Sequence, residues 1–296
     1  MSRKIAVVTG CASFIGINLT EKLLSSGWYV YGIDKLTYVA NSKEVYKLAH
    51  GYKKFEFIHK DITKLTWLPE CDVIFNLAAE SDVDNGNVDC YNFIQSNIDG
   101  VRNLLSIVDS RIVIKSDKPL FFHMSTDEVY GDTLEAIFDE SSELNPSNPY
   151  AATKASADLL IKSWARTHGL EYIIARPSNN YGPFQYPEKL IPLAVKRLSR
   201  DKKIKLHDNG KPIRTWTHVD DTCEALITIY EKGVRNRIYN ISSEFEQANI
   251  DTVHKIINTY FMGRVNIDIP DYSDHIDIRH SREGQDMQYL VNRSEN

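Results

Sequence analysis

Two neighbouring acids and a tyrosine–lysine pair are the residues of this chain that could transfer protons. Asp127 and Glu128 follow the apolar run Leu120–Met124, which predicts a buried strand of a parallel sheet. Polar side chains at the end of such a strand lie where these sheets bind ligands. Like charges held close together push their pKa values apart, so one acid can be protonated while the other is charged. Because adjacent strand residues point to opposite sides, we predict a bend where this strand ends.

Tyr150 and Lys154 lie four residues apart at the start of a predicted helix, which places them on one face, one turn apart. A free tyrosine has a pKa of about 10, and a nearby ammonium group favours the phenolate. Lowering this pKa to neutrality takes about 4 kcal/mol, which a lysine and a second cation could supply together in a poorly hydrated site. Taken alone, the pair also fits an ordinary helix surface, so its interpretation depends on the rest of the chain.

The N-terminal segment predicts a strand, a tight turn, a helix and a second strand. An apolar run that ends at Gly10 is followed by helical spacing over Phe14–Leu24 and by an apolar run that ends at Asp34. Gly10 and Gly16 frame the turn, and backbone N–H groups at the start of the helix can face a pyrophosphate. Asp34 can accept hydrogen bonds from ribose hydroxyls and would repel a 2′-phosphate. The unit therefore predicts bound NAD rather than NADP.

Two residues of this region have more than one interpretation. Ser13 occupies the position where the middle glycine of a Gly-x-x-Gly-x-x-Gly pattern is expected, and its side chain either tilts the cofactor or donates its hydroxyl group. Asp61 could hydrogen-bond the adenine amine, or it could cap a helix before Thr63. The sequence leaves both pairs of alternatives open.

Alternating strands and helices predict an α/β fold, with a Rossmann-like doubly wound parallel sheet and a smaller C-terminal lobe that binds the substrate. The further predicted elements are strands at Phe55–His59, Asp72–Asn76, Tyr172–Ala175 and Ile238–Ile241, helices over Ile98–Val108, Tyr150–Gly169 and Thr222–Tyr230, and another helix from Asn249. Turn-forming residues become frequent after Arg176. We therefore assign residues 1–177 and 216–241 to an NAD-binding domain, and residues 178–215 and 242–296 to the smaller lobe.

The composition excludes several classes of function. A net charge of -5 over 296 residues gives no electrostatic footprint for nucleic acid or for an anionic membrane. No apolar stretch is long enough to span a bilayer, and the first strand begins too early for a signal peptide, so we expect a cytoplasmic protein. The four cysteines are scattered, and neither a disulfide framework nor a metal site is indicated.

Taken together, these segments resemble the extended short-chain dehydrogenase/reductase superfamily, and within it the nucleotide-sugar 4,6-dehydratases of the dTDP-glucose type. The resemblance covers nearly the whole chain. It is carried by Asp34–Tyr38, Leu77–Ser81, Ser125–Gly131, Tyr150 with Lys154, Ser178–Pro183, Glu188–Pro192, and Ile213–Arg214 with Trp216. The Asp127–Glu128 pair discriminates best, because epimerases and decarboxylases of the same fold lack two acids in tandem.

The resemblance implies a dehydration in which NAD serves as an internal redox cofactor. Tyr150 is expected to take the proton of the sugar 4-hydroxyl, which Thr126 also hydrogen-bonds, while Lys154 lowers the pKa of Tyr150 and holds the nicotinamide ribose. Hydride then moves from C4 to NAD and leaves a 4-keto sugar, whose carbonyl group acidifies the C5 proton. Glu128 is expected to remove that proton while protonated Asp127 protonates the departing 6-hydroxyl, and hydride returns to C6. A solvated acidic loop is the alternative interpretation of the two acids.

The resemblance also implies which residues bind the two ligands. The expected cofactor contacts are Gly10, Ser13, Phe14, Ile15, Gly16, Asp34, Lys35, Thr37, Asp61, Ile62, Leu77, Ala78, Ala79, Tyr150 and Lys154. The expected contacts to the nucleotide-sugar substrate are Ser81, Thr126, Asn179, Glu188, Lys189, Leu190, Arg214, Asn249 and Arg282. Among these, Arg214 is suited to a bidentate grip on phosphate oxygens.

Three features depart from the family pattern. The first is Ser13. The second is the segment around Arg282, where Glu283 and Gln285 replace a proline and a histidine and weaken the expectation of an identical phosphate clamp. The third is that family members continue beyond the position of Asn296, which leaves open whether the C-terminal edge of the nucleotide pocket is complete.

The resemblance further implies a homodimer that pairs through the helices beginning near Asn97 and Tyr150. Spacing alone leaves Ile98, Val101 and Leu105 open between core and interface. Alternative functions are the same reaction on UDP-glucose, a nucleotide-sugar 4-epimerase, which would keep the 6-hydroxyl, and a non-catalytic dinucleotide sensor. A sensor predicts the loss of reactive side chains, yet both acids, the tyrosine and the lysine are present.

Overall fold

Seven parallel strands form the main sheet of the protein. The computed structural model describes residues 4–113, 118–133, 137–262, 271–280 and 286–292. In spatial order the strands are β10 (Arg237–Ile241), β6 (Tyr172–Pro177), β5 (Leu120–Met124), β4 (Val73–Asn76), β1 (Ile5–Thr9), β2 (Tyr29–Asp34) and β3 (Phe55–His59). The chain runs outward from β1 through β2 to β3 and then returns to the other side of β1 with β4. The sheet therefore has a switch point between β1 and β4, where folds of this type bind ligands at the carboxyl ends of the strands.

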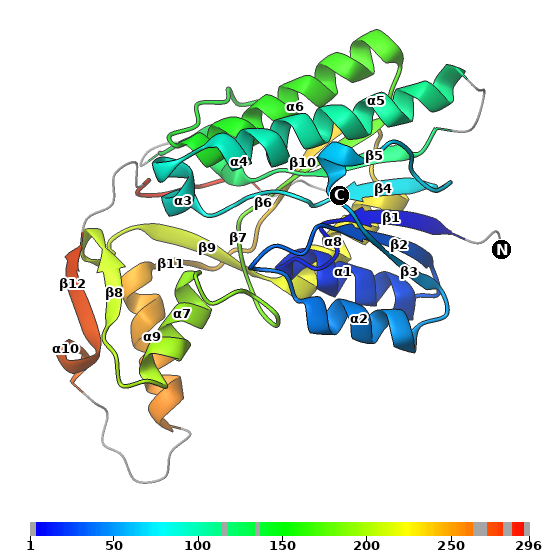
Figure 1. Ribbon diagram of the computed structural model, residues 1–296. Helices are drawn as coiled ribbons and strands as arrows, with labels where there is room; N and C mark the ends of the chain where they lie inside the picture. Colours follow the sequence, from blue (N-terminus) through cyan, green and yellow to red (C-terminus); the bar gives the residue numbers. More distant parts are fainter. Residues whose placement is uncertain (1–3, 114–117, 134–136, 263–270, 281–285, 293–296) are drawn as a thin grey trace.

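Helices cover both faces of this sheet (Figure 1). One face carries α1 (Phe14–Ser25), α2 (Ser42–Gly51) and α8 (Val219–Lys232), and the other carries α5 (Gly100–Val113) and α6 (Pro149–His168). Strand residues alternate between the two layers: Ala6 and Val8 pack with the first group, and Val7 packs with the second. Burial on both faces explains why these strands are continuous apolar runs.

A smaller lobe is built from the later part of the chain. Its elements are β7 (Asn179–Tyr181), α7 (Leu190–Leu198), β8 (Ile204–His207), β9 (Ile213–His218), β11 (Glu246–Ala248), α9 (Asn249–Met262), α10 (Tyr272–His275) and β12 (Ile276–His280). Strands β11, β9 and β7 form one sheet, and β12 pairs with β8. Leu198, Leu206, Val253 and Ile257 belong to a separate apolar core between α7, β8 and α9. This lobe therefore does not depend on the core of the main sheet.

Short elements follow three strands of the main sheet. They are the 3₁₀ helix Ile62–Lys64 after β3, helices α3 (Val83–Val88) and α4 (Tyr91–Phe93) and the π-helical turn Ile94–Asp99 after β4, and the 3₁₀ helix Asp127–Tyr130 after β5. A further 3₁₀ helix, Asp208–Gly210, lies in the smaller lobe between β8 and β9.

The predicted fold class is confirmed, and strands β2, β3 and β5 have the predicted bounds. Gly169 ends α6 in the left-handed conformation, with φ 66°, as expected of a glycine after a helix. The sequence analysis did not predict α2 or α7. Trp216–His218, which we assign to the NAD-binding domain, are part of β9 in the sheet with β7 and β11, and α8 begins directly after them at Val219.

Within the described ranges, none of the helices combines the length and apolar character that crossing a bilayer requires. The same residues contain no group of three histidine, cysteine or acidic side chains placed to hold a metal ion.

Candidate active site

A continuous groove runs along the carboxyl ends of the central strands. Its first part, beside β1 and β2, is lined by Gly10, Ser13, Asp34, Lys35, Thr37, Asp61, Ile62, Ala78 and Ala79, all predicted cofactor contacts. Its second part, toward the smaller lobe, is lined by Ser13, Phe14, Ile15, Leu77 and Ala79 together with Thr126, Asp127, Glu128, Tyr150 and Lys154. Ser13, Val39 and Ala79 line both parts, so the two form one elongated site.

The glycine turn of the groove packs three backbone segments closely against one another. Gly10 has φ 68°, and a Cβ atom there would lie 2.7 Å from the backbone nitrogen of Ala78. A Cβ atom on Gly16 would collide with the carbonyl oxygen of Gly10. The two glycines thus let β1, β4 and the start of α1 approach closely, and the free N–H groups of α1 face the groove as a dinucleotide phosphate site requires. The residues present fit NAD.

Ser13 is the N-cap of α1. Its hydroxyl oxygen accepts a hydrogen bond from the backbone N–H of Gly16 at 3.2 Å. The serine therefore fills a capping role that a glycine could not, and its own hydroxyl hydrogen remains available to an acceptor in the groove.

Asp34 and Asp61 are both fixed by backbone groups. The Asp34 carboxylate accepts from the N–H of Ala12 at 3.0 Å and of Leu36 at 2.7 Å, although burial raises its pKa. Asp61 accepts from the N–H of Thr63 at 2.9 Å, which is the helix-capping alternative. Because one oxygen of Asp61 makes this cap and the residue also lines the groove, the cap does not remove it from the cofactor site.

The predicted bend after β5 is present. Thr126 is extended, and its side chain accepts from the N–H of Glu128 at 3.3 Å, so it caps the 3₁₀ helix Asp127–Tyr130. This turn brings both acids into the part of the groove that Tyr150 and Lys154 also line. We use the name acid turn for residues Thr126–Glu128.

The two acids have unequal surroundings. Burial and, to a lesser extent, the neighbouring Glu128 raise the pKa of Asp127 to about 8, against the opposing effects of Arg214 and of a hydrogen bond with Thr126. Glu128 is less buried, and it accepts a hydrogen bond from the side-chain amide of Asn148 at 3.2 Å. At neutral pH the turn therefore holds a protonated carboxyl group beside a second acid, as a coupled acid and base require.

Tyr150 and Lys154 lie together, but the predicted effect of the lysine on the tyrosine is not seen in the chain itself. Burial raises the pKa of Tyr150, Glu128 and Asp127 raise it further, and only a hydrogen bond with Thr126 lowers it. The Lys154 ammonium instead donates to the carbonyl oxygen of Met124 at 2.6 Å. Burial lowers the pKa of Lys154 to about 8. Burial and the neighbouring acids, and not Lys154, therefore set the pKa of Tyr150 in the chain alone.

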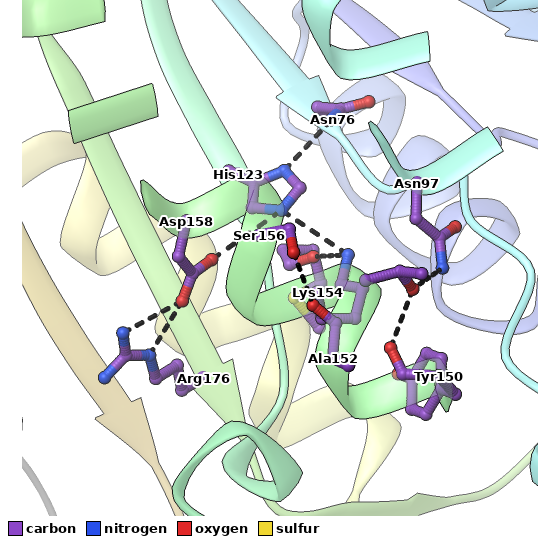
Figure 2. A network of polar contacts seen from close by, with 11 residues as sticks. Asn76, Asn97, His123, Tyr150, Ala152, Lys154, Ser156, Asp158 and Arg176 are labelled. Atoms are coloured by element: carbon purple, nitrogen blue, oxygen red, sulfur yellow. Dashed lines mark hydrogen bonds and ion pairs between the residues drawn. The ribbon is translucent and has the colours of Figure 1, made fainter. Parts of the chain in front are cut away.

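Behind Lys154 lies a buried set of polar side chains that the sequence analysis missed. Figure 2 shows His123 with Asn76 on one side and with Lys154 and Asp158 on the other, and Arg176 beyond Asp158. Arg176 donates to Asp158 Oδ2 from Nε at 3.0 Å and from Nη2 at 2.9 Å. These residues come from β4, β5, α6 and β6, so only the folded sheet brings them together.

The predicted substrate residues separate into two groups. Ser81, Asn179, Glu188 and Lys189 line the groove beside the acid turn. Leu190, Arg214 and Asn249 do not line it. Leu190 begins α7, and Asn249 begins α9, where its buried Oδ1 has no hydrogen-bond partner among the described residues. Arg282 lies outside the described residues, as do Glu283 and Gln285.

Arg214 is held by backbone carbonyl groups. Its Nη1 donates to the carbonyl oxygens of Ile213 and Met287 at 2.7 and 3.3 Å, and its Nη2 donates to that of Asp286 at 2.9 Å. The charge of Arg214 also lowers the pKa of Asp127, and the predicted grip on phosphate oxygens stays a prediction.

Tyr289 is a second residue of the site that the sequence analysis missed. Its hydroxyl lies 3.5 Å from Glu128 Oε2 and forms a hydrogen bond with Asp286 Oδ2, and its ring lies 4.6 Å from the Arg214 guanidinium. Asp132 fixes this segment by accepting from the N–H groups of Met287 and Gln288 at 2.9 and 3.0 Å. The signal in the sequence is weak, because a lone tyrosine in a polar segment has no helical or strand periodicity.

The chain belongs to the NAD dependent epimerase/dehydratase family, because a sequence model of that family matches residues 6–242. It is 35% identical over 313 residues to the dTDP-glucose 4,6-dehydratase of Escherichia coli, covering 97% of this chain and 86% of that protein. It is 37% identical over 301 residues to the dTDP-glucose 4,6-dehydratase of Mycolicibacterium smegmatis, covering 97% and 84%. The predicted family is thus confirmed.

Solved structures agree with this assignment. DesIV, a dTDP-glucose 4,6-dehydratase from Streptomyces venezuelae solved with NAD and TYD bound, has a TM-score of 0.88 and 32% identity, covering 98% of this chain and 88% of DesIV. A UDP-glucuronic acid 4-epimerase from Bacillus cereus has a TM-score of 0.86 at 24% identity, which shows a shared fold.

Proposed function

We propose that this protein dehydrates a nucleotide-activated glucose, dTDP-glucose, to its 4-keto-6-deoxy product, with NAD as the cofactor. The observation that carries the proposal is the acid turn, in which Asp127 and Glu128 face the same groove as Tyr150. Relatives with 34 to 37% identity over nearly the whole chain bear the name dTDP-glucose 4,6-dehydratase. An epimerase needs a base for the 4-hydroxyl, but its reaction has no elimination step that would use the two adjacent acids.

Bound NAD would supply the acceptor for the C4 hydride and later its donor to C6, together with a positive charge on the nicotinamide ring. Tyr150 takes the proton of the 4-hydroxyl, with Thr126 positioned to hydrogen-bond the same oxygen. Lys154 adds a positive charge on the same face of α6. Because Asp127 and Glu128 raise the pKa of Tyr150, positive charges on the cofactor side have to offset them before the phenol can act as a base.

The acid turn then carries out the elimination. Glu128 removes the proton from C5, and Asp127 gives its proton to the departing 6-hydroxyl, which leaves as water. The two transfers use an acid and a base at once, so the unequal surroundings of the two residues are the requirement for this step. Ser81, Asn179, Glu188 and Lys189 line the groove where they can bind the sugar and diphosphate.

Mass spectrometry of product mixtures tests the reaction and the nucleotide together. The protein is incubated separately with dTDP-glucose and with UDP-glucose, and loss of one water is expected from dTDP-glucose. Loss of water from UDP-glucose alone would show that the substrate carries UDP and not dTDP. An unchanged mass with an inverted C4 would make the protein an epimerase, and no change with either substrate would contradict the proposal.

Glu128→Gln tests the assigned roles. The variant should still oxidise C4, seen as NADH absorbance after substrate is added, because Tyr150 and the cofactor groove are intact. Dehydration should fall by about 10²–10⁴-fold, as expected for loss of a general base. Unchanged dehydration would remove Glu128 from its role.

We also propose that the protein is a cytoplasmic homodimer that pairs through α5, α6 and the turn before α5. Leu159 on α6, with Tyr91 and Ile94 near the start of α5, is an exposed apolar side chain on this layer. Val101 and Leu105 are buried in the core of the chain itself, so they are not available to a partner. Light scattering gives the mass in solution, and a monomer that Leu159→Asp leaves unchanged would contradict the dimer.

A further inference from the structure

Three ionisable side chains occupy one face of α6 at intervals of four residues. Tyr150, Lys154 and Asp158 follow one another by one helical turn, and all three are buried. The proposed reaction uses the first two. Asp158 is fully buried and lies one turn further from the substrate, so its role needs a separate explanation.

Asp158 is only partly neutralised by its ion pair. Both donors of Arg176 reach the same carboxylate oxygen, Oδ2. The other oxygen, Oδ1, has no partner at normal hydrogen-bond geometry among the described residues and lies 3.9 Å from Nε2 of His123. Burial raises the pKa of Asp158, and Arg176, the Ser125 hydroxyl and Lys154 oppose this shift by favouring the charged carboxylate. The second oxygen of the carboxylate therefore faces His123 and Lys154 and not Arg176.

His123 lies next to both Asp158 and Lys154, and its Nε2 is the atom near each of them (Figure 2). Its Nε2 lies 3.4 Å from the Lys154 ammonium. Its Nδ1 lies 3.0 Å from the Asn76 amide, and Asn76 accepts a hydrogen bond from the Thr9 hydroxyl at 2.6 Å with its other end. Because the Asn76 oxygen accepts from Thr9, the Asn76 amide nitrogen donates to Nδ1 of His123. A neutral His123 therefore carries its proton on Nε2.

The tautomer of His123 determines whether its Nε2 can accept a hydrogen bond from Lys154. An Nε2–H group cannot accept a hydrogen bond from an ammonium, and burial keeps the imidazole neutral by lowering its pKa well below the usual value. Figure 2 shows two charged residues behind Lys154, Asp158 on its own helix and Arg176 on β6. In front of it lie Tyr150, Asp127 and Glu128. Asp158 is the negative charge that acts on Lys154 from the buried side.

We propose that Asp158 is a positioning residue of the active site, which keeps Lys154 positively charged by acting across His123, while Arg176 holds the carboxylate in place. The inference rests on the proposed function, because it is the base Tyr150 that needs a charged Lys154. Burial favours the neutral amine, and Asp158 is the group that opposes this effect. Without that charge, the phenolate of Tyr150 would lose its neighbouring cation.

Asp158→Asn tests the inference, because it keeps the shape of the side chain and removes its charge. The rate of C4 oxidation, followed as NADH formation in a single turnover, should fall on the alkaline side as Lys154 loses its proton. In the variant this alkaline limb should move to lower pH by about one unit. Asp109→Asn is the matched control, since Asp109 pairs with His168 at the far end of the same helix and should leave the limb in place.

A second variant covers the case in which Asp158→Asn leaves Arg176 buried without a partner and prevents folding. Asp158→Asn with Arg176→Gln removes both charges and leaves two amides that can hydrogen-bond each other. Because Arg176 lies beyond Asp158, the double variant should move the alkaline limb in the same direction by a smaller amount. A purely structural role would lower the rate at all pH values and leave the limb where it is.

NMR of the lysine side chains measures the same property without turnover. In protein labelled at the lysine Cε, the resonance missing from Lys154→Met identifies Lys154, and its titration midpoint should fall by about one unit in Asp158→Asn. A wild-type protein that does not dehydrate dTDP-glucose would overturn the proposed function. The titration of Lys154 would still test the effect of Asp158 on its charge. Normal dehydration with an unchanged Lys154 midpoint and alkaline limb in the folded variants would overturn the role of Asp158.

Discussion

The cofactor groove and the acid turn bind their ligands by different means. In the groove, the glycine turn, the start of α1 and the cap made by Ser13 lie within seven residues of one another. In the acid turn, the surroundings of Asp127 and Glu128 come from Asn148, Arg214 and Tyr289, which are far apart in the sequence. The first site depends on backbone shape, and the second on side-chain charges collected by the fold.

This difference predicts how each region responds to substitution. A backbone site tolerates almost no added volume, and its failure should remove the cofactor and every later step. In a site made of side-chain charges, substitution of one residue should slow one step of the reaction and leave the others. The size of the defect should depend on pH.

The largest effect is expected for Gly16→Ala. The added methyl group would collide with the carbonyl oxygen of Gly10, so the turn and α1 must move apart. We expect loss of bound NAD and a fall of about 1–3 kcal/mol in the free energy of unfolding, as for overpacked sites. The NAD content of the purified protein measures the first effect, and unfolding in denaturant measures the second. Gly51→Ala in α2, where the added Cβ meets nothing within 4 Å, should keep its NAD, and equal damage in both variants would contradict the backbone interpretation.

Asp127→Asn should remove elimination and leave the cofactor bound. The amide cannot give a proton to the 6-hydroxyl, so dehydration should fall by about 10²–10⁴-fold while C4 oxidation persists. In the wild type, dehydration should fall as pH rises through about 8, the pKa at which Asp127 loses its proton.

Asp127 should also make the stability of the folded protein depend on pH. The pKa of Asp127 is raised in the folded protein, so its favourable contribution is complete below about pH 4 and is lost as the pH approaches about 8. The Tm of Asp127→Asn should therefore match the wild type near pH 4 and exceed it at pH 8. A constant difference in Tm would show that Asp127 is not buried in its acid form.

Tyr289→Phe should give a smaller defect confined to elimination. It keeps the ring against Arg214 and removes the hydroxyl beside Glu128. We expect about a tenfold slower exchange of the C5 proton with deuterated water, equivalent to the loss of one hydrogen bond, and an unchanged rate of NADH formation. If both rates fell together, the tyrosine would only hold the segment in place.

Ser13→Gly should have the smallest effect. It restores the usual glycine but removes the cap on α1, and a glycine N-cap costs only a few tenths of a kcal/mol. We expect NAD binding, measured by calorimetry, to change by less than about threefold. Binding that became tenfold tighter would show that the serine obstructs the cofactor.

The residues predicted to contact the cofactor, apart from Gly16, line the groove, and the sequence could place them there because their signals are local. Apolar runs gave the strands, and the spacing of Gly10, Gly16 and Asp34 identified the ligand. The bend at the acid turn also followed from a local rule, since adjacent strand residues cannot face one ligand.

The rest of the site depends on contacts that no local pattern encodes. Arg214 donates to carbonyl groups of a segment some seventy residues later in the chain, a contact that its own sequence neighbourhood does not indicate. Tyr289 lies in that same segment. His123 and Asp158 looked like parts of a strand and a helix, and their proximity to Lys154 follows only from the order of β4, β5 and β6 in the sheet.

The late position of residues 286–292 also has a consequence for the synthesis of the protein. This segment bridges Phe138 through Val291 and supplies the phenol next to Glu128. A ribosome has already released every strand of the main sheet before it reaches this stretch. A nascent or prematurely terminated chain could therefore capture NAD and still be a poor catalyst, so translation has to pass Val291 before the enzyme becomes competent.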